Sequence, residues 1–322
     1  MRWPLVFPAV LLLFGVSCTS SPERRAEAMA REIGSAAVLA VRKGEVLFSY
    51  GDVTRNLPCH SIRKPFLGAL YGIYRERGII DIDATIAELG IDDIPPELSE
   101  NEKRACVRDL LAARSGIYHP AAGEVPAMER ARPERGSHPA DTHFYYNNWD
   151  FNALGTIFRE QTGEDIFAAF EREIAVPIGM QDFSAANCRY AYEYSKSVHP
   201  AYFFSMSARD MARFGELLAA WGEWDGRQII PREWIEVSTL AYSEKGIHND
   251  PYGYLWCIVP AEQGLGRGFY HTGMSVHLLT VFPDLDLVLV HRVDTEEPYT
   301  TTFREVVELM EQVMEIALKE TS

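Results

Sequence analysis

The two ends of the chain carry β-strand patterns, whereas the middle carries helical ones. Near the N-terminus, SAAVLAVRKGEVLFSYGD predicts two strands joined by a tight turn at Lys43 and Gly44. Strand patterns return only in the C-terminal part, in YGYLWCIVP, GFYHTG, VHLLTVFP and LDLVLVHRVD. One sheet is the simplest way to combine strands so far apart in sequence. We therefore expect an α+β fold whose antiparallel sheet contains both ends of the chain.

Helical and loop patterns dominate the segment between the two groups of strands. Further helices are predicted over 22–33, which is polar, and over 303–318, which is amphipathic. These terminal helices are expected to cover the sheet. We therefore predict one domain over 21–322, in which a mostly helical lobe is inserted into a sheet lobe. The sheet lobe is about 21–84 with 240–322, and the helical lobe is about 85–239.

The first twenty residues are predicted to be a signal peptide. Arg2 precedes an apolar run from Leu5 to Val16, which is shorter than the ~20 residues that a membrane-spanning helix requires. The run ends at SCTSSPERR, and two processing routes fit this sequence: lipidation of Cys18, as in a lipoprotein, or simple cleavage near Ser20. We expect export to the periplasm or cell envelope, with a membrane contact only through a lipid on Cys18.

Charge and cysteine usage exclude several classes of function. With 31 Lys and Arg against 46 Asp and Glu, the formal net charge of -15 repels nucleic acid and anionic lipid. The remaining cysteines show no CxxC pair and no Cys/His ligand spacing, so we expect neither a metal nor another cofactor. An oxidising envelope would allow a disulfide, but scattered cysteines in a large domain are more often buried small hydrophobes. They are Cys59, Cys106, Cys188 and Cys257.

The stretch CHSIRKPFLGALYGI places Ser61 three residues before Lys64, where an apolar helix is predicted to begin. At a helix N-terminus the dipole and the free N–H groups favour negative charge on the serine oxygen. Lys64, one turn further on, would face the same side, and a partly desolvated lysine can take the serine proton. The alternative is that Ser61 only caps the helix and that Lys64 is solvated.

The stretch FYYNNWDFNALG contains two overlapping Tyr-x-Asn patterns, Tyr145 with Asn147 and Tyr146 with Asn148. A phenol beside a lysine is a plausible general base, and an asparagine two residues later can hold a substrate amide or the lysine. An aromatic cluster that packs in the core is the alternative.

The stretch YHTGMS lies on a predicted C-terminal strand. Gly273 would let a substrate backbone approach closely, and the backbone N–H of Met274 could act as an oxyanion donor beside that of Ser61. A strand that ends in a bulge is the alternative.

Taken in this order, the three stretches resemble the motifs of the serine β-lactamase and penicillin-binding protein superfamily. The resemblance is closest to class C β-lactamases, D-alanyl-D-alanine carboxypeptidases and the related esterases and amidases. It covers almost the whole exported chain, because several intervening segments also resemble that family. These segments are KPFLGALYGIYRERGIIDIDATI, VRDLLAARSGIY, NALGTIFREQTG and SARDMARFGELL.

The resemblance implies that Ser61 is the acylated nucleophile, Lys64 its proton partner and Tyr146 the base, with Asn148 as a ligand of the substrate. The register with Tyr146 is favoured because the family's motif is followed by a glycine nine residues after the tyrosine, here Gly155. The backbone groups of Ser61 and Met274 correspond to the family's oxyanion donors.

His271, Thr272 and Gly273 occupy the positions of the family's Lys-Thr-Gly strand motif and are expected to bind substrate. His271 departs from the usual lysine, which helps to hold a substrate carboxylate, so β-lactam hydrolysis is less strongly implied than catalysis itself. An unperturbed histidine titrates near ~6.5. We therefore expect His271 to gain its charge as the pH falls from about 8 to about 6.

The resulting hypothesis is an exported serine hydrolase that opens an amide or ester of a small-molecule or peptide-like acyl substrate. One alternative is a D-alanyl-D-alanine carboxypeptidase or low-turnover penicillin-binding protein. Another is a catalytically silent envelope protein that only binds. The sequence does not name the acyl group, because the predicted long loop over 120–141 and the pocket shape set specificity.

Overall fold

The computed structural model describes residues 21–94 and 96–319. The predicted signal peptide and the lipidation of Cys18 lie outside the described residues. Within the described ranges, no helix combines the length and the apolar character needed to cross a membrane.

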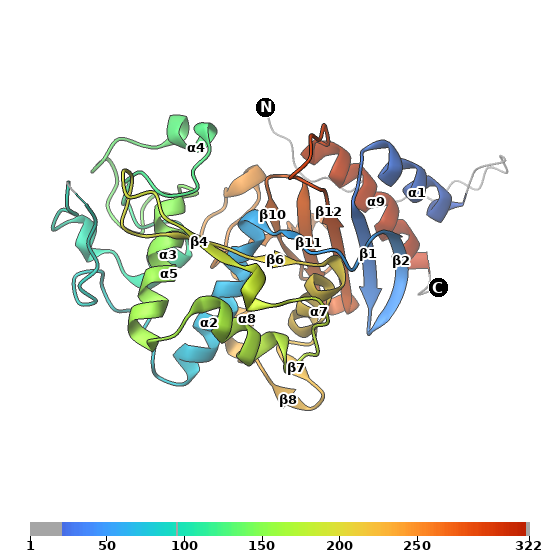
Figure 1. The fold of residues 1–322 in the computed structure, drawn as a ribbon, viewed down its shortest axis with the longest axis horizontal. Coiled ribbons are helices and arrows are strands. Elements are labelled where there is room, and N and C mark those ends of the chain that lie inside the picture. The colour runs from blue at the N-terminus through green and yellow to red at the C-terminus, as the bar shows by residue number, and fades with distance from the viewer. Residues whose placement is uncertain (1–20, 95, 320–322) are drawn as a thin grey trace.

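Six antiparallel strands form the central sheet, in the order β2-β1-β12-β11-β10-β9 (Figure 1). Strand β1 pairs with β12, so the two ends of the chain meet in the middle of the sheet. This arrangement confirms the predicted α+β fold. The strand bounds are β1 Ala37–Arg42, β2 Glu45–Gly51, β9 Cys257–Ile258, β10 Phe269–Gly273, β11 His277–Phe282 and β12 Leu287–Arg292.

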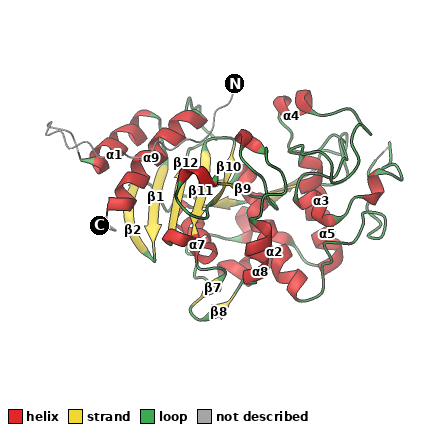
Figure 2. Cartoon of the chain, turned by 180° about the vertical axis from the view of Figure 1, so that it is seen from behind, coloured by secondary structure: helices red, strands yellow, loops and turns green. Residues whose placement is uncertain are grey.

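Helices cover both faces of this sheet, which is why β11 and β12 are buried along their whole length. Helices α1 (Pro22–Glu32) and α9 (Phe303–Lys319) pack together, and Leu278 and Leu289 line a small cavity with residues of α9. Helix α7 (Ala208–Ala219) lies on the other face of the sheet. Figure 2 shows the molecule from behind, with α7 labelled. A Cβ on Gly215 of α7 would come within 2.4 Å of Val288, so this close approach requires glycine. The sequence analysis had placed α7 in the helical lobe, whereas it packs against the sheet.

Helices α2 (Arg63–Glu76) and α5 (Asn148–Thr162) pack against each other in the inserted lobe, whereas the predicted bounds put the segment of α2 in the sheet lobe. Helix α2 is buried from its first residue through Tyr74, and the Tyr71 hydroxyl donates to the Leu154 carbonyl at 2.7 Å. The predicted long loop contains a short helix of its own, α4. The smaller helices are α3 Val107–Leu111, α4 Pro126–Ala131, α6 Ile166–Phe170 and α8 Arg232–Ser238.

Three two-stranded sheets complete the fold, and one of them leads directly into α2. In it, β3 (Leu57–Pro58) pairs with β6 (Ser205–Met206). The other pairs are β4 Arg189–Ala191 with β5 Ala201–Phe203, and β7 Glu223–Trp224 with β8 Arg227–Gln228.

Arg292, the last residue of β12, ties the large sheet to this small one. Its guanidinium donates to the carbonyl oxygens of Met206 at 2.7 Å, Leu57 at 2.7 Å and Pro58 at 3.0 Å. Its Nε donates to His277 Nδ1 at 3.1 Å. Because the side chain is fully buried, no water competes for these acceptors. We call this set of four hydrogen bonds the Arg292 clamp.

Replacing Arg292 with methionine should lower the free energy of unfolding by about 3 kcal/mol, measured by denaturant titration. Each buried carbonyl left without a donor costs about 1–3 kcal/mol, and release of a buried charge offsets part of the total. As a control, Arg232→Met removes an exposed ion pair with Glu236 and should change stability by less than about 1 kcal/mol. Equal losses in the two variants would contradict a special role for the clamp.

Candidate active site

Ser61 and Lys64 lie at the start of α2 and contact each other directly. Ser61 belongs to a short 3-10 turn, His60–Ile62, and a hydrogen bond of 2.8 Å joins its Oγ to Lys64 Nζ. Lys64 is 0% exposed, and its amine lies 4.7 Å from the ring centroid of Tyr146 and 4.6 Å from that of Phe151. No side-chain hydrogen bond caps α2, so the alternative of a capping serine beside a solvated lysine is excluded.

Burial sets the protonation of the groups around Ser61. It holds the pKa of Lys64 well below its ordinary value, and the charge of Arg63 acts in the same direction. Burial raises the pKa of Tyr146, while the neighbouring Ser61 hydroxyl lowers it in part. The ring of Tyr146 is partly exposed, but its hydroxyl is buried. The arrangement therefore offers an uncharged amine that can accept the serine proton. The Tyr146 phenol is protonated at rest, so it is better suited to donate a proton than to act first as the expected base.

The end of β10 passes very close to the segment that precedes Ser61. A Cβ on Gly273 would lie 2.6 Å from the Cys59 carbonyl oxygen and 3.2 Å from the His60 Cβ. Only glycine allows this approach, which brings the backbone on either side of Gly273 next to the backbone before Ser61. This close contact is with the chain itself, and the approach of a substrate backbone to Gly273 stays a prediction.

Three non-glycine residues beside this contact adopt left-handed backbone conformations. They are His60 (φ 47), Met274 (φ 51) and Ser275 (φ 61). Met274 and Ser275 are the two central residues of the turn from β10 to β11, which a bond from Val276 N to the Gly273 carbonyl closes at 3.1 Å. Such a turn usually takes Asn or Gly at these positions. Strain of this kind gathers at functional sites, where the surrounding structure holds it.

His271 and Thr272 of β10 engage different partners. The His271 ring lies 6.2 Å from that of Tyr146, whereas Thr272 Oγ1 lies 3.2 Å from His248 Nε2. His271 Nδ1 is 2.8 Å from the Thr272 carbonyl, which can only accept, so Nδ1 carries the hydrogen. Its Nε2 is then an unprotonated acceptor, buried and without a hydrogen-bond partner.

The expected titration of His271 between about pH 8 and about pH 6 is wrong for this environment. The side chain is 0% exposed, and burial, reinforced by the neighbouring Lys64, lowers its pKa well below the ordinary value. His271 is therefore a neutral hydrogen-bonding group in this pH range.

Comparisons with known proteins agree with this fold. The family model described as Beta-lactamase matches residues 24–304. The chain belongs to the β-lactamase family. No curated protein matches the sequence.

Solved structures of the β-lactamase fold resemble the chain over most of its length. A Bacillus anthracis protein assigned as a 6-aminohexanoate-dimer hydrolase superposes with a TM-score of 0.68 at 21% identity, covering 91% of this chain and 81% of that one. A family VIII carboxylesterase gives a TM-score of 0.68 at 16% identity, with 92% and 97% covered. A penicillin-binding protein homologue from Caulobacter crescentus gives 0.68 at 15%, with 94% and 99% covered.

Within this β-lactamase fold, the two Tyr-x-Asn registers have different surroundings. The Tyr145 hydroxyl donates to the Met128 carbonyl at 2.8 Å, and Asn147 caps α5 by accepting from Trp149 N. Tyr146 instead lies against the Lys64 amine. These contacts give Tyr145 and Asn147 structural roles and support the register with Tyr146 and Asn148.

Asn148 begins α5, and half of its amide is already used. Its Nδ2 donates to the Gly123 carbonyl at 2.9 Å, while its Oδ1 is buried without a hydrogen-bond partner. The free oxygen is an acceptor for an N–H group, which is compatible with the predicted role of substrate ligand.

Three residues beside the site were missed by the sequence analysis: Arg63, Phe151 and His248. Phe151 had the helical spacing of a core residue, and its position against the Lys64 amine depends on how α2 and α5 cross. Arg63 lies between Ser61 and Lys64 in the sequence, but because an arginine is almost never fully buried, its burial was not expected. His248 lies in a short 3-10 turn, Ile247–Asn249, which is too short for a periodic pattern to identify it.

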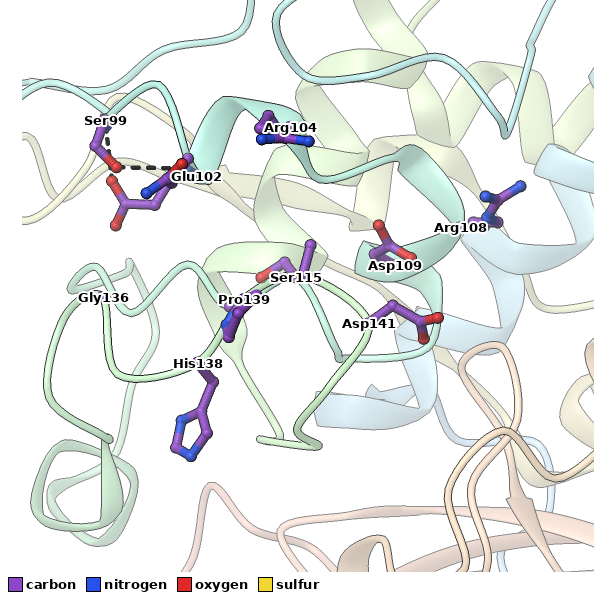
Figure 3. A pocket seen from close by; sticks show the side chains of 13 residues that line it. Ser99, Glu102, Arg104, Arg108, Asp109, Ser115, Gly136, His138, Pro139 and Asp141 are labelled. Carbon is purple, nitrogen blue, oxygen red and sulfur yellow. Dashed lines mark hydrogen bonds between the residues drawn. The ribbon is translucent and has the colours of Figure 1, made fainter.

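A cavity of about 570 Å³, drawn in Figure 3, lies apart from the Ser61 and Lys64 pair. It opens between the 3-10 turn Glu102–Arg104, α3 and the loop around His138, and its lining includes neither Ser61 nor Lys64. Charged groups of both signs share its wall, among them Arg104, Arg108, Asp109 and Asp141. No cluster of His, Cys, Asp and Glu within the described ranges could hold a metal ion.

The protonation of His271 can be tested by ¹⁵N NMR of the imidazole nitrogens. The Nδ1–H tautomer should persist without a charge from about pH 8 to about pH 6, because burial opposes the cation. His271→Asn would assign the resonances. A titration midpoint near ~6.5 would contradict the neutral state and restore a pH-dependent cation at this position.

Proposed function

We propose that this protein is a serine hydrolase that cleaves an ester or amide through an acyl-enzyme on Ser61. The observation that carries the proposal is the 2.8 Å contact between Ser61 Oγ and a Lys64 amine that is buried and has a lowered pKa. An uncharged amine in hydrogen-bond contact with a hydroxyl is an activated nucleophile without a histidine.

In the acylation step, Ser61 Oγ attacks the acyl carbon while its proton passes to Lys64 Nζ. The backbone N–H groups of Ser61 and Met274 stabilise the oxyanion of the tetrahedral intermediate. The bond to the leaving group then breaks, and the Tyr146 hydroxyl donates the proton that the departing oxygen or nitrogen needs. Tyr146 recovers a proton from Lys64, which returns both groups to their starting state.

Deacylation runs through the same groups in reverse. Water attacks the acyl carbon and gives its proton to the Tyr146 and Lys64 pair, and Ser61 Oγ leaves with a proton from Lys64. The Asn148 Oδ1 and the His271 Nε2 are acceptors for the part of the substrate that carries N–H or O–H groups. The contact with His248 fixes the position of the Thr272 hydroxyl, which was expected to bind substrate.

The neutral state of His271 favours ester and amide hydrolysis over D-alanyl-D-alanine carboxypeptidase activity. A carboxypeptidase binds a substrate carboxylate, to which a neutral imidazole offers at most one hydrogen bond. The names of two similar structures, a 6-aminohexanoate-dimer hydrolase and a carboxylesterase, are consistent with amide and ester substrates. The predicted signal peptide would place this activity in the periplasm or envelope, with Cys18 as a possible lipid anchor.

The nucleophile can be identified by intact-mass analysis after exposure to a fluorophosphonate. The wild type should gain one adduct on Ser61, and Ser61→Ala should lose both the adduct and esterase turnover, because the serine hydroxyl that contacts the Lys64 amine is then gone. Ser137→Ala, which changes an exposed loop serine, serves as the control and should behave as the wild type. An adduct on another serine, together with full activity of Ser61→Ala, would contradict the mechanism.

A parallel exposure to a penicillin separates the alternatives within the family. A long-lived penicillin adduct on Ser61 with no ester turnover would favour the low-turnover penicillin-binding protein. Ligand binding without any covalent adduct would favour a silent binding protein.

The roles of the two tyrosines differ enough to be separated by kinetics. Tyr146→Phe should lower kcat by about 10² or more, the usual size of a lost proton-transfer group. Tyr145→Phe removes only a hydrogen bond to the Met128 carbonyl and should have a much smaller effect on kcat. The opposite ranking would show that Tyr145 and Asn147 form the working register.

A further inference from the structure

The loop that precedes α4 is bonded to two other segments at a single residue, Gly123. The Gly123 N–H donates to Glu193 Oε1 at 2.7 Å, and the Gly123 carbonyl accepts from Asn148 Nδ2 at 2.9 Å. Glu193 lies two residues after β4, so the two bonds tie the loop to segments far apart in the sequence. The proposed mechanism uses Asn148 but assigns no role to Glu193.

The backbone of Gly123 depends on these bonds, because glycine is the residue most free to change its backbone angles. Gly123 has a left-handed conformation (φ 73), and a Cβ there would lie 3.3 Å from Phe203 Cζ. Asn152 Nδ2 donates to the Ala122 carbonyl at 3.0 Å, and Glu193 holds the other end of the same peptide group. Loss of the Glu193 bond would therefore loosen the backbone that carries the Gly123 carbonyl.

Glu193 is held at both its backbone and its side chain. The N–H groups of Lys196 and Ser197 donate to the Glu193 carbonyl at 2.8 Å and 3.1 Å, and Lys196 Nζ lies 3.1 Å from the Glu193 carboxylate. The bond from the Gly123 N–H lowers the pKa of Glu193, so the carboxylate is charged at neutral pH. Hydrogen bonds to a charged group are roughly twice as strong as neutral ones. Glu193 is therefore a firm anchor for Gly123.

The contact with Gly123 decides which end of the Asn148 amide faces the site. A carbonyl oxygen can only accept, so the end that meets Gly123 is the nitrogen, and Oδ1 points the other way. Phe151 and Asn152 follow Asn148 by three and four residues, so they share its face of α5. The Phe151 ring centroid lies 4.6 Å from the Lys64 amine, and Asn152 bonds the first residue of α2 at 3.1 Å. Asn148, whose buried Oδ1 finds no hydrogen-bond partner among the described residues, is thus on the face turned toward the start of α2.

We propose that Glu193 is a positioning residue which, through Gly123, keeps the Asn148 oxygen turned toward the substrate and so favours acyl groups that carry an N–H. The inference rests on the proposed function, in which the acyl group lies beside Ser61. A buried acceptor without a donor is unfavourable. A substrate N–H removes this penalty, whereas an oxygen in the same place cannot.

The test compares two 4-nitrophenyl esters that differ in one group. The ester of N-acetylglycine has an N–H two bonds from the acyl carbon, and the ester of acetoxyacetic acid has an oxygen in that place. The wild type should favour the N–H ester in kcat/KM by about tenfold, the usual effect of one hydrogen bond. In Glu193→Ala this preference should fall by about three- to tenfold, chiefly through a higher KM for the N–H ester, because Asn148 no longer holds its oxygen in place.

Three further variants define how Glu193 acts. Glu193→Gln keeps an oxygen acceptor for the Gly123 N–H and should retain most of the preference. Lys196→Met removes the ion pair with Glu193 but not the bond to Gly123, so its preference should equal that of the wild type. Asn148→Ala should abolish the preference. Adding Glu193→Ala to it should change the ratio no further, because Glu193 acts only through Asn148.

An unchanged ratio of the two esters in Glu193→Ala would overturn the proposal. If both esters slow alike, Glu193 supports only the structure, or the Asn148 oxygen holds Lys64 in place of the substrate. The absence of any preference in the wild type would overturn the proposal too, since the site would then present no acceptor to the acyl group.

A second measurement does not depend on turnover. The side-chain amide of Asn148, assigned through Asn148→Ala, should show a lower ¹H–¹⁵N heteronuclear NOE in Glu193→Ala than in the wild type, because its partner at Gly123 has become mobile. If Glu193→Ala fails to fold, Glu193→Met replaces it, since methionine keeps the length of the side chain without a carboxylate. An unchanged NOE in a folded variant would refute the inference.

These outcomes separate this inference from the proposed function. A Ser61 adduct with the same ester ratio in every variant would leave the serine hydrolase intact and remove the role of Glu193. No fluorophosphonate adduct on Ser61 in the wild type would refute the hydrolase itself.

Discussion

The Arg292 clamp is the constraint on which the geometry of the site depends. Arg292 ends the strand that joins the two termini of the chain in one sheet, and its donors hold the β3 and β6 carbonyls. Strand β3 leads within three residues to Ser61, so the sheet fixes the start of α2 directly. On the other side, Gly273 lets β10 touch the same segment. Ser61 is thus held from two neighbouring places on one rigid sheet.

Three cations are buried near this segment, and their surroundings give them different consequences. Burial opposes the charge of Arg292 as well, but its guanidinium donates to carbonyl groups that would otherwise lack a donor, so its hydrogen bonds stabilise the fold. Lys64 can lose its charge, and burial favours that loss. Arg63 cannot lose its charge, and burial opposes that charge, which the rings of Tyr202 and Phe203 offset in part. Desolvation therefore opposes all three charges: hydrogen bonds outweigh it at Arg292, whereas at Lys64 it favours an uncharged amine that can act as a base.

The periodic features of the sequence predicted the periodic features of the structure. The hairpin around Lys43 and Gly44, the C-terminal strands and both terminal helices are present where the patterns placed them. The prediction was least accurate for β9, which has only two residues although the stretch YGYLWCIVP predicted a longer strand. There the segment from Tyr252 onwards forms isolated bridges in place of a ladder. Apolar composition predicts burial, but pairing also depends on which neighbours are available.

The site was predictable as a set of residues and less so as a set of charges. Ser61, Lys64 and Tyr146 could be proposed from motif order, and the structure brings them together. The state of His271 could not, because a pKa depends on burial and on neighbours distant in sequence. The burial of Arg63 was equally hidden, since it requires Asn152 and Tyr202 to come from two other elements. Electrostatics is a property of the packed molecule, and it was the part that the linear sequence left open.

The sheet holds the backbone around Ser61, whereas the inserted lobe carries Tyr146 and Asn148, so the two parts of the site can vary independently. The backbone around Ser61 and Met274 is strained at His60, Met274 and Ser275, and such conformations persist only where the surrounding structure imposes them. The sheet and the Arg292 clamp supply that rigidity. Asn148 instead begins α5 in the inserted lobe, with Tyr146 just before the helix, and Asn148 is bonded to the loop at Gly123. A change in that loop can therefore alter substrate contacts while the strained backbone beside Ser61 keeps its geometry.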